Sequence, residues 1–172
     1  NIGIMDFDSY GMVSEFEHFK TLIEEQGYKV KIIDPRNLKY HNNKLYADDF
    51  RVDLIYRRAV TLDLMKHYNE VEDFLIAYKN QDVCVVGSFR SQIIHNKIIF
   101  SILHDQDKIS FLSPQEKIFI NKYIPETKII NPQDNELIGW IINHQKSLVL
   151  KPMDLYGAEG VMVGQDVTKQ KW

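Results

Sequence analysis

Short apolar runs alternate with amphipathic stretches along the first 95 residues. Four of the runs have the length and aliphatic content of buried strands, namely 2–5, 29–33, 52–56 and 83–86. Apolar residues at helical spacing predict two helices, one over residues 14–27 and one over 62–78. The polar stretch 40–49 is expected to be loop. The resulting β-α-β-β-α-β order predicts an α/β, Rossmann-like domain with a mostly parallel sheet.

Two serine-to-glutamate spacings indicate where helices begin. Ser14 stands three residues before Glu17, and Ser113 stands three residues before Glu116. Each spacing fits a capping box, in which the serine accepts from a backbone N–H and the glutamate accepts in return. Pro114 strengthens the second signal because proline suits the first helical position.

Beyond residue 95 the pattern changes to helices followed by a hairpin. Helical periodicity predicts helices over 92–104, 113–123 and 134–145. Apolar runs predict strands at 127–130, 148–151 and 161–163. We therefore expect two domains, an α/β domain over 1–95 and an α+β domain over 96–172.

Charge and composition exclude several classes of function. The net charge of −3 provides no global field for nucleic acid or an anionic membrane. No apolar run reaches the roughly 20 residues that cross a bilayer, and the first residues lack the basic start of a signal peptide. The six histidines are scattered and do not form metal-ligand spacings. We therefore expect the protein to be cytoplasmic. The single cysteine, Cys84, stands in an apolar run and is expected to be a small side chain of the core.

The most informative stretch is a strand, a lysine, a small-residue loop and a second strand. Lys151 ends the first strand and can place its ammonium group on a phosphate oxygen. The loop Gly157, Ala158, Glu159, Gly160 lets backbone N–H groups approach a polyphosphate closely. On this stretch alone, a surface hairpin with a solvated lysine explains the pattern equally well.

A second lysine, Lys97, stands early in the apolar segment that follows the first domain. Together with the segments 53–58 and 124–127, this ordered set resembles the ATP-grasp superfamily, in particular D-alanine–D-alanine ligases and the glutathionylspermidine synthase-like branch. The resemblance implies a pre-ATP-grasp domain followed by the lysine-bearing subdomain of an ATP-grasp fold.

The resemblance also implies an activity, an ATP-dependent ligation of a carboxylate to an amine or thiol through an acyl phosphate. Lys97 and Lys151 would contact the α- and β-phosphates, and the Gly157 to Gly160 loop would close over the β- and γ-phosphates. ATP and magnesium are the implied cofactors. After Gly160 only Asp166 is acidic, so the magnesium ligands are not expected in this chain. We therefore expect an amino-terminal fragment with weak or no nucleotide binding and no turnover of its own.

Polar residues at the ends of the predicted strands are the candidates for the substrate site. In parallel sheets ligands bind beyond the carboxyl ends of the strands, and the residues there include Asp8, Ser9, Arg57, Arg58, Ser88 and Arg90. Arginines at such a place can hold a carboxylate in bidentate fashion. Alternation along the strand should aim Arg57 and Arg58 to opposite faces. The expected partners are small carboxylate and amine substrates, and self-association as a homodimer is left open.

Three other interpretations compete with a ligase. Asp6 and Asp8 after the first strand suit a receiver domain, but Arg57 and Arg58 hold the place of its phosphoacceptor aspartate. A Rossmann dinucleotide-binding domain needs a glycine fingerprint that residues 7–12 do not supply. A non-catalytic binding or scaffold protein derived from a ligase is the third.

Overall fold

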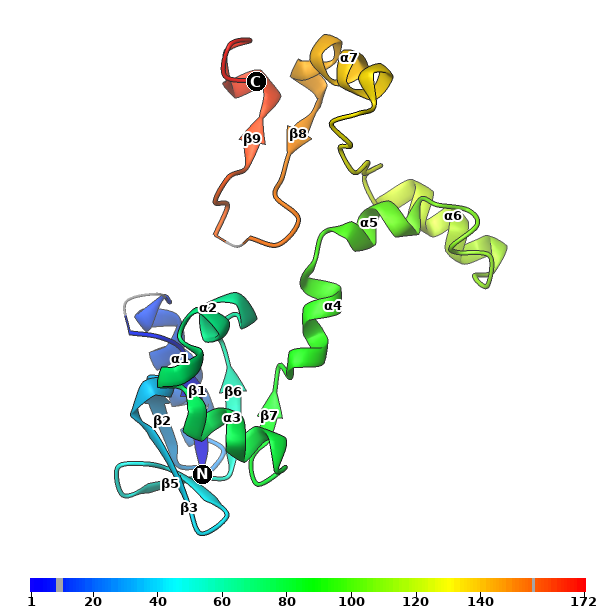
Figure 1. Ribbon diagram of the computed structural model, residues 1–172. Helices are drawn as coiled ribbons and strands as arrows, with labels where there is room; N and C mark the ends of the chain where they lie inside the picture. The colour runs from blue at the N-terminus through cyan, green and yellow to red at the C-terminus, as the bar shows by residue number, and fades with distance from the viewer. Residues whose placement is uncertain (9–10, 156) are drawn as a thin grey trace. The chain divides into compact units, whose positions relative to one another are not determined.

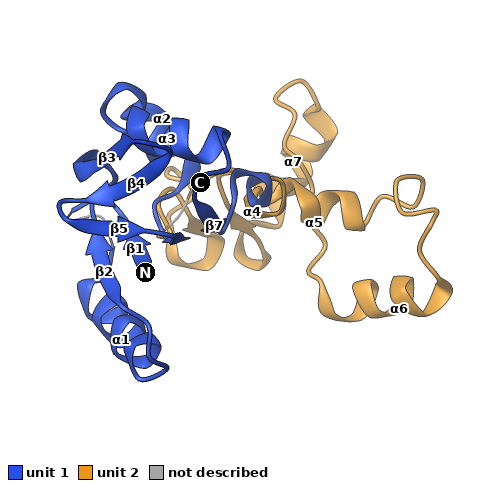
Figure 2. Ribbon diagram, turned by 90° about the horizontal axis from the view of Figure 1, so that it is seen from below, with its two compact units in different colours: residues 1–92 blue, residues 93–172 orange. Residues whose placement is uncertain are grey.

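The computed structural model describes residues 1–8, 11–155 and 157–172, and Ser9 of the expected substrate set lies outside them. The chain divides into two compact units, residues 1–92 and 93–172 (Figure 2). This division falls three residues before the expected boundary at 95.

Unit 1 is built on a parallel four-stranded sheet with the strand order β2-β1-β6-β7 (Figure 1). Its strands are β1 (Ile2–Met5), β2 (Val30–Ile33), β6 (Leu54–Arg57) and β7 (Cys84–Val86). Its helices are α1 (Val13–Glu24), α2 (Thr61–Lys66) and α3 (Glu72–Lys79), with 3₁₀ turns at Pro35–Asn37, Tyr68–Glu70 and Phe89–Ser91. The expected α/β class with a parallel sheet is confirmed.

The order of the strands reverses between β1 and β6. After β2 the chain crosses back over β1 and adds β6 on its other side, then continues outward to β7. The side chains of successive residues in β1 point to opposite faces of the sheet, as in any pleated strand. Ile4 packs with Phe16 of α1, and Met5 packs in a larger cluster with Ile55 and Phe74 of α3. All five side chains are at most 4% exposed, so the central strand is buried on both sides.

The expected loop over 40–49 is wrong, because this stretch belongs to an antiparallel meander. Its strands are β3 (Leu38–His41), β4 (Lys44–Ala47) and β5 (Phe50–Val52). Leu45 and Ala47 alternate with polar residues and pack into the core of unit 1. The turn between β3 and β4 places both Asn42 and Asn43 at positive φ, which suits a two-residue hairpin.

Three other expectations for unit 1 also fail. Helix α1 begins after Met12 without a side-chain cap, so Ser14 lies inside the helix and does not cap it. The expected helix 62–78 is two helices, because His67 leaves helical geometry (φ −104°, ψ 26°) and the following 3₁₀ turn brings Val71 into the core. Cys84 is exposed on the edge strand β7 and is not a core side chain.

Unit 2 consists of short helices and one hairpin. Its elements are α4 (Gln92–His95, which starts at the division), α5 (Ile98–Leu103), α6 (Pro114–Tyr123), α7 (Asn135–Asn143), β8 (Val149–Leu150) and β9 (Met162–Val163), with 3₁₀ turns at Gln145–Ser147 and Gly164–Asp166. The capping box of Ser113 and Glu116 is confirmed, with the Glu116 N–H donating to Ser113 Oγ at 3.3 Å. The expected strand at 127–130 is wrong, since these residues have no regular structure.

The expected helix over 92–104 breaks at Asn96 and Lys97. The Asn96 side-chain oxygen accepts from the Ile98 N–H at 2.9 Å, which satisfies a donor at the start of α5.

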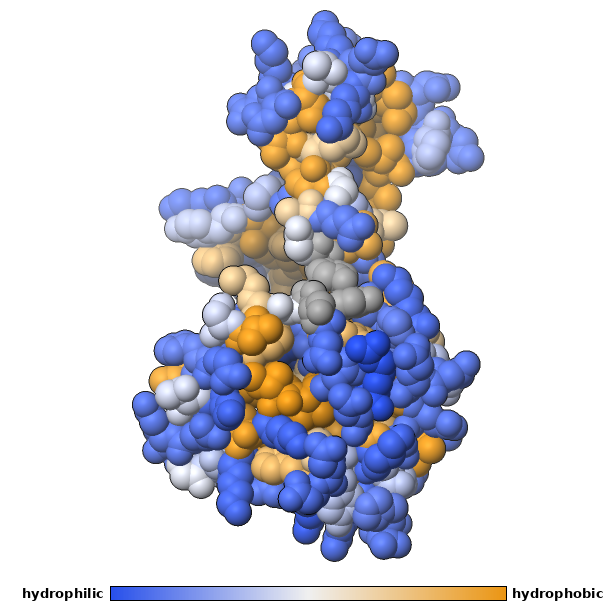
Figure 3. All heavy atoms as spheres, turned by 90° about the vertical axis from the view of Figure 1, so that its left-hand side faces the viewer, coloured by the Kyte–Doolittle hydropathy of each residue, from blue (hydrophilic) through white to orange (hydrophobic). Residues whose placement is uncertain are grey.

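Unit 2 buries few apolar side chains, and in its described part Ile109 and Ile120 are the buried ones. Figure 3 shows apolar residues reaching the surface in both parts of the chain.

Candidate functional site

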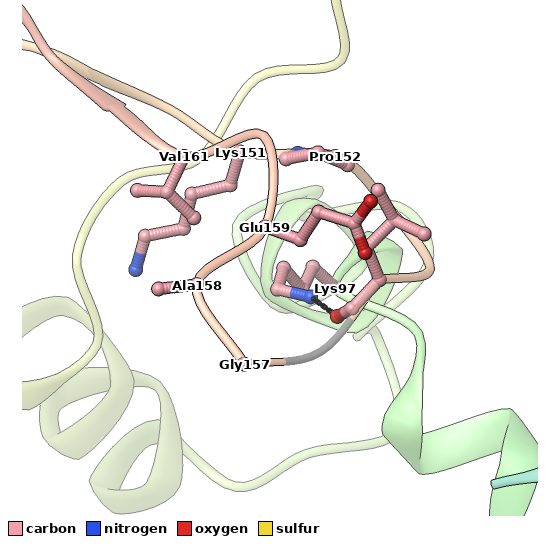
Figure 4. A pocket seen from close by; sticks show the side chains of 8 residues that line it. Lys97, Lys151, Pro152, Gly157, Ala158, Glu159 and Val161 are labelled. Atoms are coloured by element: carbon pink, nitrogen blue, oxygen red, sulfur yellow. Dashed lines mark hydrogen bonds between the residues drawn. The ribbon is translucent and has the colours of Figure 1, made fainter. Parts of the chain in front are cut away.

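The hairpin loop between β8 and β9 encloses a hollow together with the break between α4 and α5 (Figure 4). The hollow has a volume of about 330 Å³. It is lined by Lys97, Lys151, Pro152, Leu155, Gly157, Ala158, Glu159 and Val161. The two lysines and the small-residue loop that the sequence singled out therefore lie around one space.

The loop backbone has an unusual conformation in its second half. Gly157, Ala158 and Gly160 have φ values of 61°, 62° and 68°, in the left-handed region. Glycine adopts this region freely, whereas Ala158 is held there at a cost of about 1 kcal/mol. At Gly160 a Cβ atom would also lie 2.7 Å from the Pro152 ring, so this glycine is needed for the close approach as well. The loop thus turns back tightly onto the residue that follows Lys151.

The two lysines differ in how they are held. The Lys97 ammonium donates to the Leu155 carbonyl oxygen at 2.8 Å, shown as a dashed line in Figure 4. Lys151 is exposed and extends past Ala158, and among the described residues its ammonium group has no hydrogen-bond or ion-pair partner. The carboxylate of Glu159 lines the same hollow. The site therefore combines two cations with one anion, and it leaves Lys151 available to an anionic ligand.

The base of the hairpin is anchored by Gln145 and Gly164, which the sequence analysis did not single out. Gln145 is 8% exposed, and its side-chain amide donates to the carbonyl oxygens of Gly164 at 2.9 Å and Val167 at 2.8 Å. The Gly164 N–H donates to the Leu148 carbonyl oxygen at 2.9 Å. A Cβ on Gly164 would lie 1.8 Å from the Gln145 carbonyl oxygen, so only glycine fits. The one available signal was a glycine directly after the return strand.

In unit 1, Arg57 is engaged by the protein itself. Its guanidinium donates to the carbonyl oxygens of Gly87, Ala59 and Ser88 and to the Thr61 hydroxyl. It also stacks over the Phe89 ring at 5.1 Å. Burial lowers the pKa of the guanidinium from its ordinary value. This arginine joins the ends of β6 and β7.

Arg58 points to other neighbours. Its guanidinium pairs with Glu15 of α1 at 3.0 Å and is exposed. Burial raises the pKa of the partly buried Asp6. A hydrogen bond from the Phe7 backbone N–H and the positive charge of Arg58 lower this pKa again, but by less. Arg57 and Arg58 thus contact different elements, in keeping with strand alternation.

The remaining expected substrate residues are distributed along the carboxyl edge of the sheet. The Asp8 N–H donates to Asp34 at 2.9 Å, the Ser88 carbonyl accepts from Arg57 and Ser91, and Arg90 is exposed. Among the described residues, no contact links Asp8, Ser88 or Arg90 to Arg58, so the expected substrate residues do not form one cluster. Asp34 and Asp63 are buried acids of unit 1 that the sequence did not single out.

Asp34 is expected to be the main source of acid sensitivity in unit 1. Burial raises the pKa of its carboxyl, but hydrogen bonds from Arg36 and from the Asp8 N–H outweigh burial and hold the pKa below its ordinary 3.8. Because the folded pKa is the lower one, the stabilisation is complete above 3.8 and is lost as the pH falls through the folded value.

The change Asp34→Asn should therefore lower the free energy of unfolding by about 1–3 kcal/mol at pH 7. It should also weaken the loss of stability that wild type shows as the pH falls below the ordinary pKa of 3.8. Urea unfolding at pH 7 and at a pH below 3.8 measures the two effects. The exposed Asp48, paired with Lys31 at 2.7 Å, provides the control Asp48→Asn, for which little change is expected. Equal pH dependence in wild type and Asp34→Asn would contradict the prediction.

Comparison of the sequence with protein-family models gave no match, and comparison with curated proteins gave none either. Within the described ranges, no three His, Cys, Asp or Glu side chains are grouped so that they could hold a metal ion. No helix in the same ranges combines the length and the apolar character needed to cross a membrane.

Proposed function

We propose that the hollow around Lys97 and Lys151 binds the phosphate chain of ATP, in the lysine-bearing part of an ATP-dependent carboxylate-amine or carboxylate-thiol ligase. The observation that carries the proposal is the meeting of two lysines from distant segments at one hollow under a loop with left-handed residues. A phosphate chain carries several negative charges, so it binds best where lysine ammonium groups and backbone N–H groups can both contact its oxygens.

The residues present fit phosphate oxygens better than they fit a metal ion. Two ammonium groups face one carboxylate, Glu159, so the hollow carries a net positive charge within a chain of net charge −3. Bound ATP would supply the phosphoryl group that activates a substrate carboxylate. Lys97 and Lys151 would neutralise phosphate charge, and the loop would orient the chain.

The experiment that tests this proposal follows the loop amides by NMR while ATP or tripolyphosphate is added. The amide signals of Gly157 to Gly160 and of Lys97 are expected to shift in a saturable way with both ligands. Similar responses to ATP and tripolyphosphate would identify the phosphate chain as the recognised group. The absence of any response at about 10 mM ligand, a concentration at which even a millimolar site is mostly filled, would refute the proposal.

Lys151→Gln is the sharpest variant, because the Lys151 ammonium is exposed and unpartnered among the described residues. Its loss should raise the Kd for tripolyphosphate about tenfold, as expected when one charge-assisted hydrogen bond of about 1.5 kcal/mol is removed. The matched control is Lys146→Gln, an exposed lysine of the same unit that does not line the hollow. Equal affinities of wild type and Lys151→Gln would show that the anion binds elsewhere.

A further inference from the structure

The first half of the hairpin loop is tied to the α4–α5 break at three successive residues. The Lys97 N–H donates to the Met153 carbonyl oxygen at 2.9 Å, and the Lys97 ammonium donates to the Leu155 carbonyl oxygen at 2.8 Å. Between these contacts, His95 Nε2 lies 3.6 Å from a carboxylate oxygen of Asp154. All these residues belong to unit 2. The contacts involve both the backbone and the side chains of residues 153–155.

Lys97 can hold the loop and bind an anion at the same time. A lysine ammonium has three N–H donors, and the Leu155 carbonyl takes one of them. Within residues 1–8, 11–155 and 157–172 no acceptor takes the other two, which can face a ligand in the hollow that Lys97 lines. A ligand bound to Lys97 is therefore linked through the same ammonium to the loop, and any residue that fixes 153–155 also fixes the position of this ammonium.

We propose that His95 is a positioning residue for the anion site. Its imidazole contacts the Asp154 carboxylate at 3.6 Å and holds residues 153–155 against the α4–α5 break. The loop and the Lys97 ammonium then form one ordered unit before any ligand arrives. Binding loses less conformational freedom when the loop is ordered in advance, so the His95–Asp154 contact strengthens anion binding without touching the anion. The anion-binding half of this inference rests on the proposed function, whereas the ordering of the loop does not.

The size of the effect follows from the exposure of the two side chains. His95 and Asp154 are 35% and 44% exposed, so their attraction is screened by water. We expect a change of about two- to fivefold in anion affinity, which is typical of such pairs. The two hydrogen bonds of Lys97 remain in the absence of His95 and keep the loop close, so the hairpin itself should still form.

The test is a double-mutant cycle with His95→Ala, Asp154→Ala and the combined variant, with Asp107→Ala as an exposed acidic control in the same unit. Amide order parameters of Gly157 to Gly160 are measured in the ligand-free protein. In each single variant they are expected to fall from the range of ordered backbone towards about 0.6, and in the double variant no further. The Kd for tripolyphosphate should rise about two- to fivefold in the single variants, again without a further rise in the double variant.

The outcomes separate this inference from the proposed function. Unchanged order parameters in both single variants, or additive effects in the double variant, would overturn the role of His95 even if tripolyphosphate binds normally. Failure of tripolyphosphate to bind the wild-type protein would refute the anion site, and the order parameters would still decide whether His95 orders the loop. A fall in order equal to that in Asp107→Ala would point to general loosening and would also count against His95.

Discussion

Replacing Phe74 with alanine is expected to lower the free energy of unfolding of unit 1 by about 3–5 kcal/mol. Phe74 has no exposed surface and lies on α3 in the centre of the larger core cluster. Its ring contacts the rings of Tyr78 and Phe89, with centroid distances of 6.4 and 6.2 Å. The change removes a large buried surface and leaves a cavity between the sheet and the helix, and both effects destabilise the fold.

The composition of the two units allows this effect to be localised. Both tryptophans of the chain, Trp140 and Trp172, belong to unit 2. Circular dichroism follows the unfolding of both units, whereas tryptophan fluorescence follows unit 2. Phe74→Ala should shift the circular dichroism transition to lower denaturant and leave the fluorescence transition in place. Ile76→Ala, at a 38% exposed position of the same helix, should cost less than about 1 kcal/mol. A similar loss in both variants would contradict the assigned core.

Much of unit 1 was predictable because its parallel strands are mostly apolar. The central strands β1 and β6 are apolar runs up to Arg57, as burial on both faces requires, and the edge strands β2 and β7 are apolar apart from Lys31. The meander was missed for the opposite reason. Each of its strands exposes one face, so polar residues such as Lys39 and Lys44 hide the alternation, and the two asparagines that turn the chain look like loop. Short strands of this kind are determined by the core they cover.

The position of the lysines and the small-residue loop was predictable to a similar extent. The sequence placed Lys151 at the end of a strand before the glycines, and the structure brings Lys97 to the same hollow. The contact of Lys97 with Leu155 could not be predicted, because it depends on a helix break that periodicity does not reveal. The contacts of Arg57 could not be predicted from the sequence for a related reason. Its partners are backbone carbonyl groups, which leave no mark in a sequence.

Arg57→Met is the second change with a large expected effect, a loss of about 2–4 kcal/mol in the free energy of unfolding. The methionine fills part of the space next to Phe89 but cannot donate a hydrogen bond. Three carbonyl oxygens, on Ala59, Gly87 and Ser88, then lose a charged donor at the ends of β6 and β7. The part-buried Ala59 carbonyl then loses its charged donor, which is costly, whereas the Gly87 contact is exposed and the Ser88 carbonyl still accepts from Ser91.

Arg58→Met is the matched control, since it removes the same side chain one residue later. Arg58 is exposed and its main partner is the single carboxylate of Glu15, so the expected loss is below about 1 kcal/mol. Arg57→Lys should recover only part of the stability, because one ammonium group cannot reach acceptors spread over two strand ends. Urea unfolding of the three variants, followed by circular dichroism, gives the comparison. If Arg57→Met were as stable as Arg58→Met, the hydrogen bonds of Arg57 would not stabilise the ends of β6 and β7.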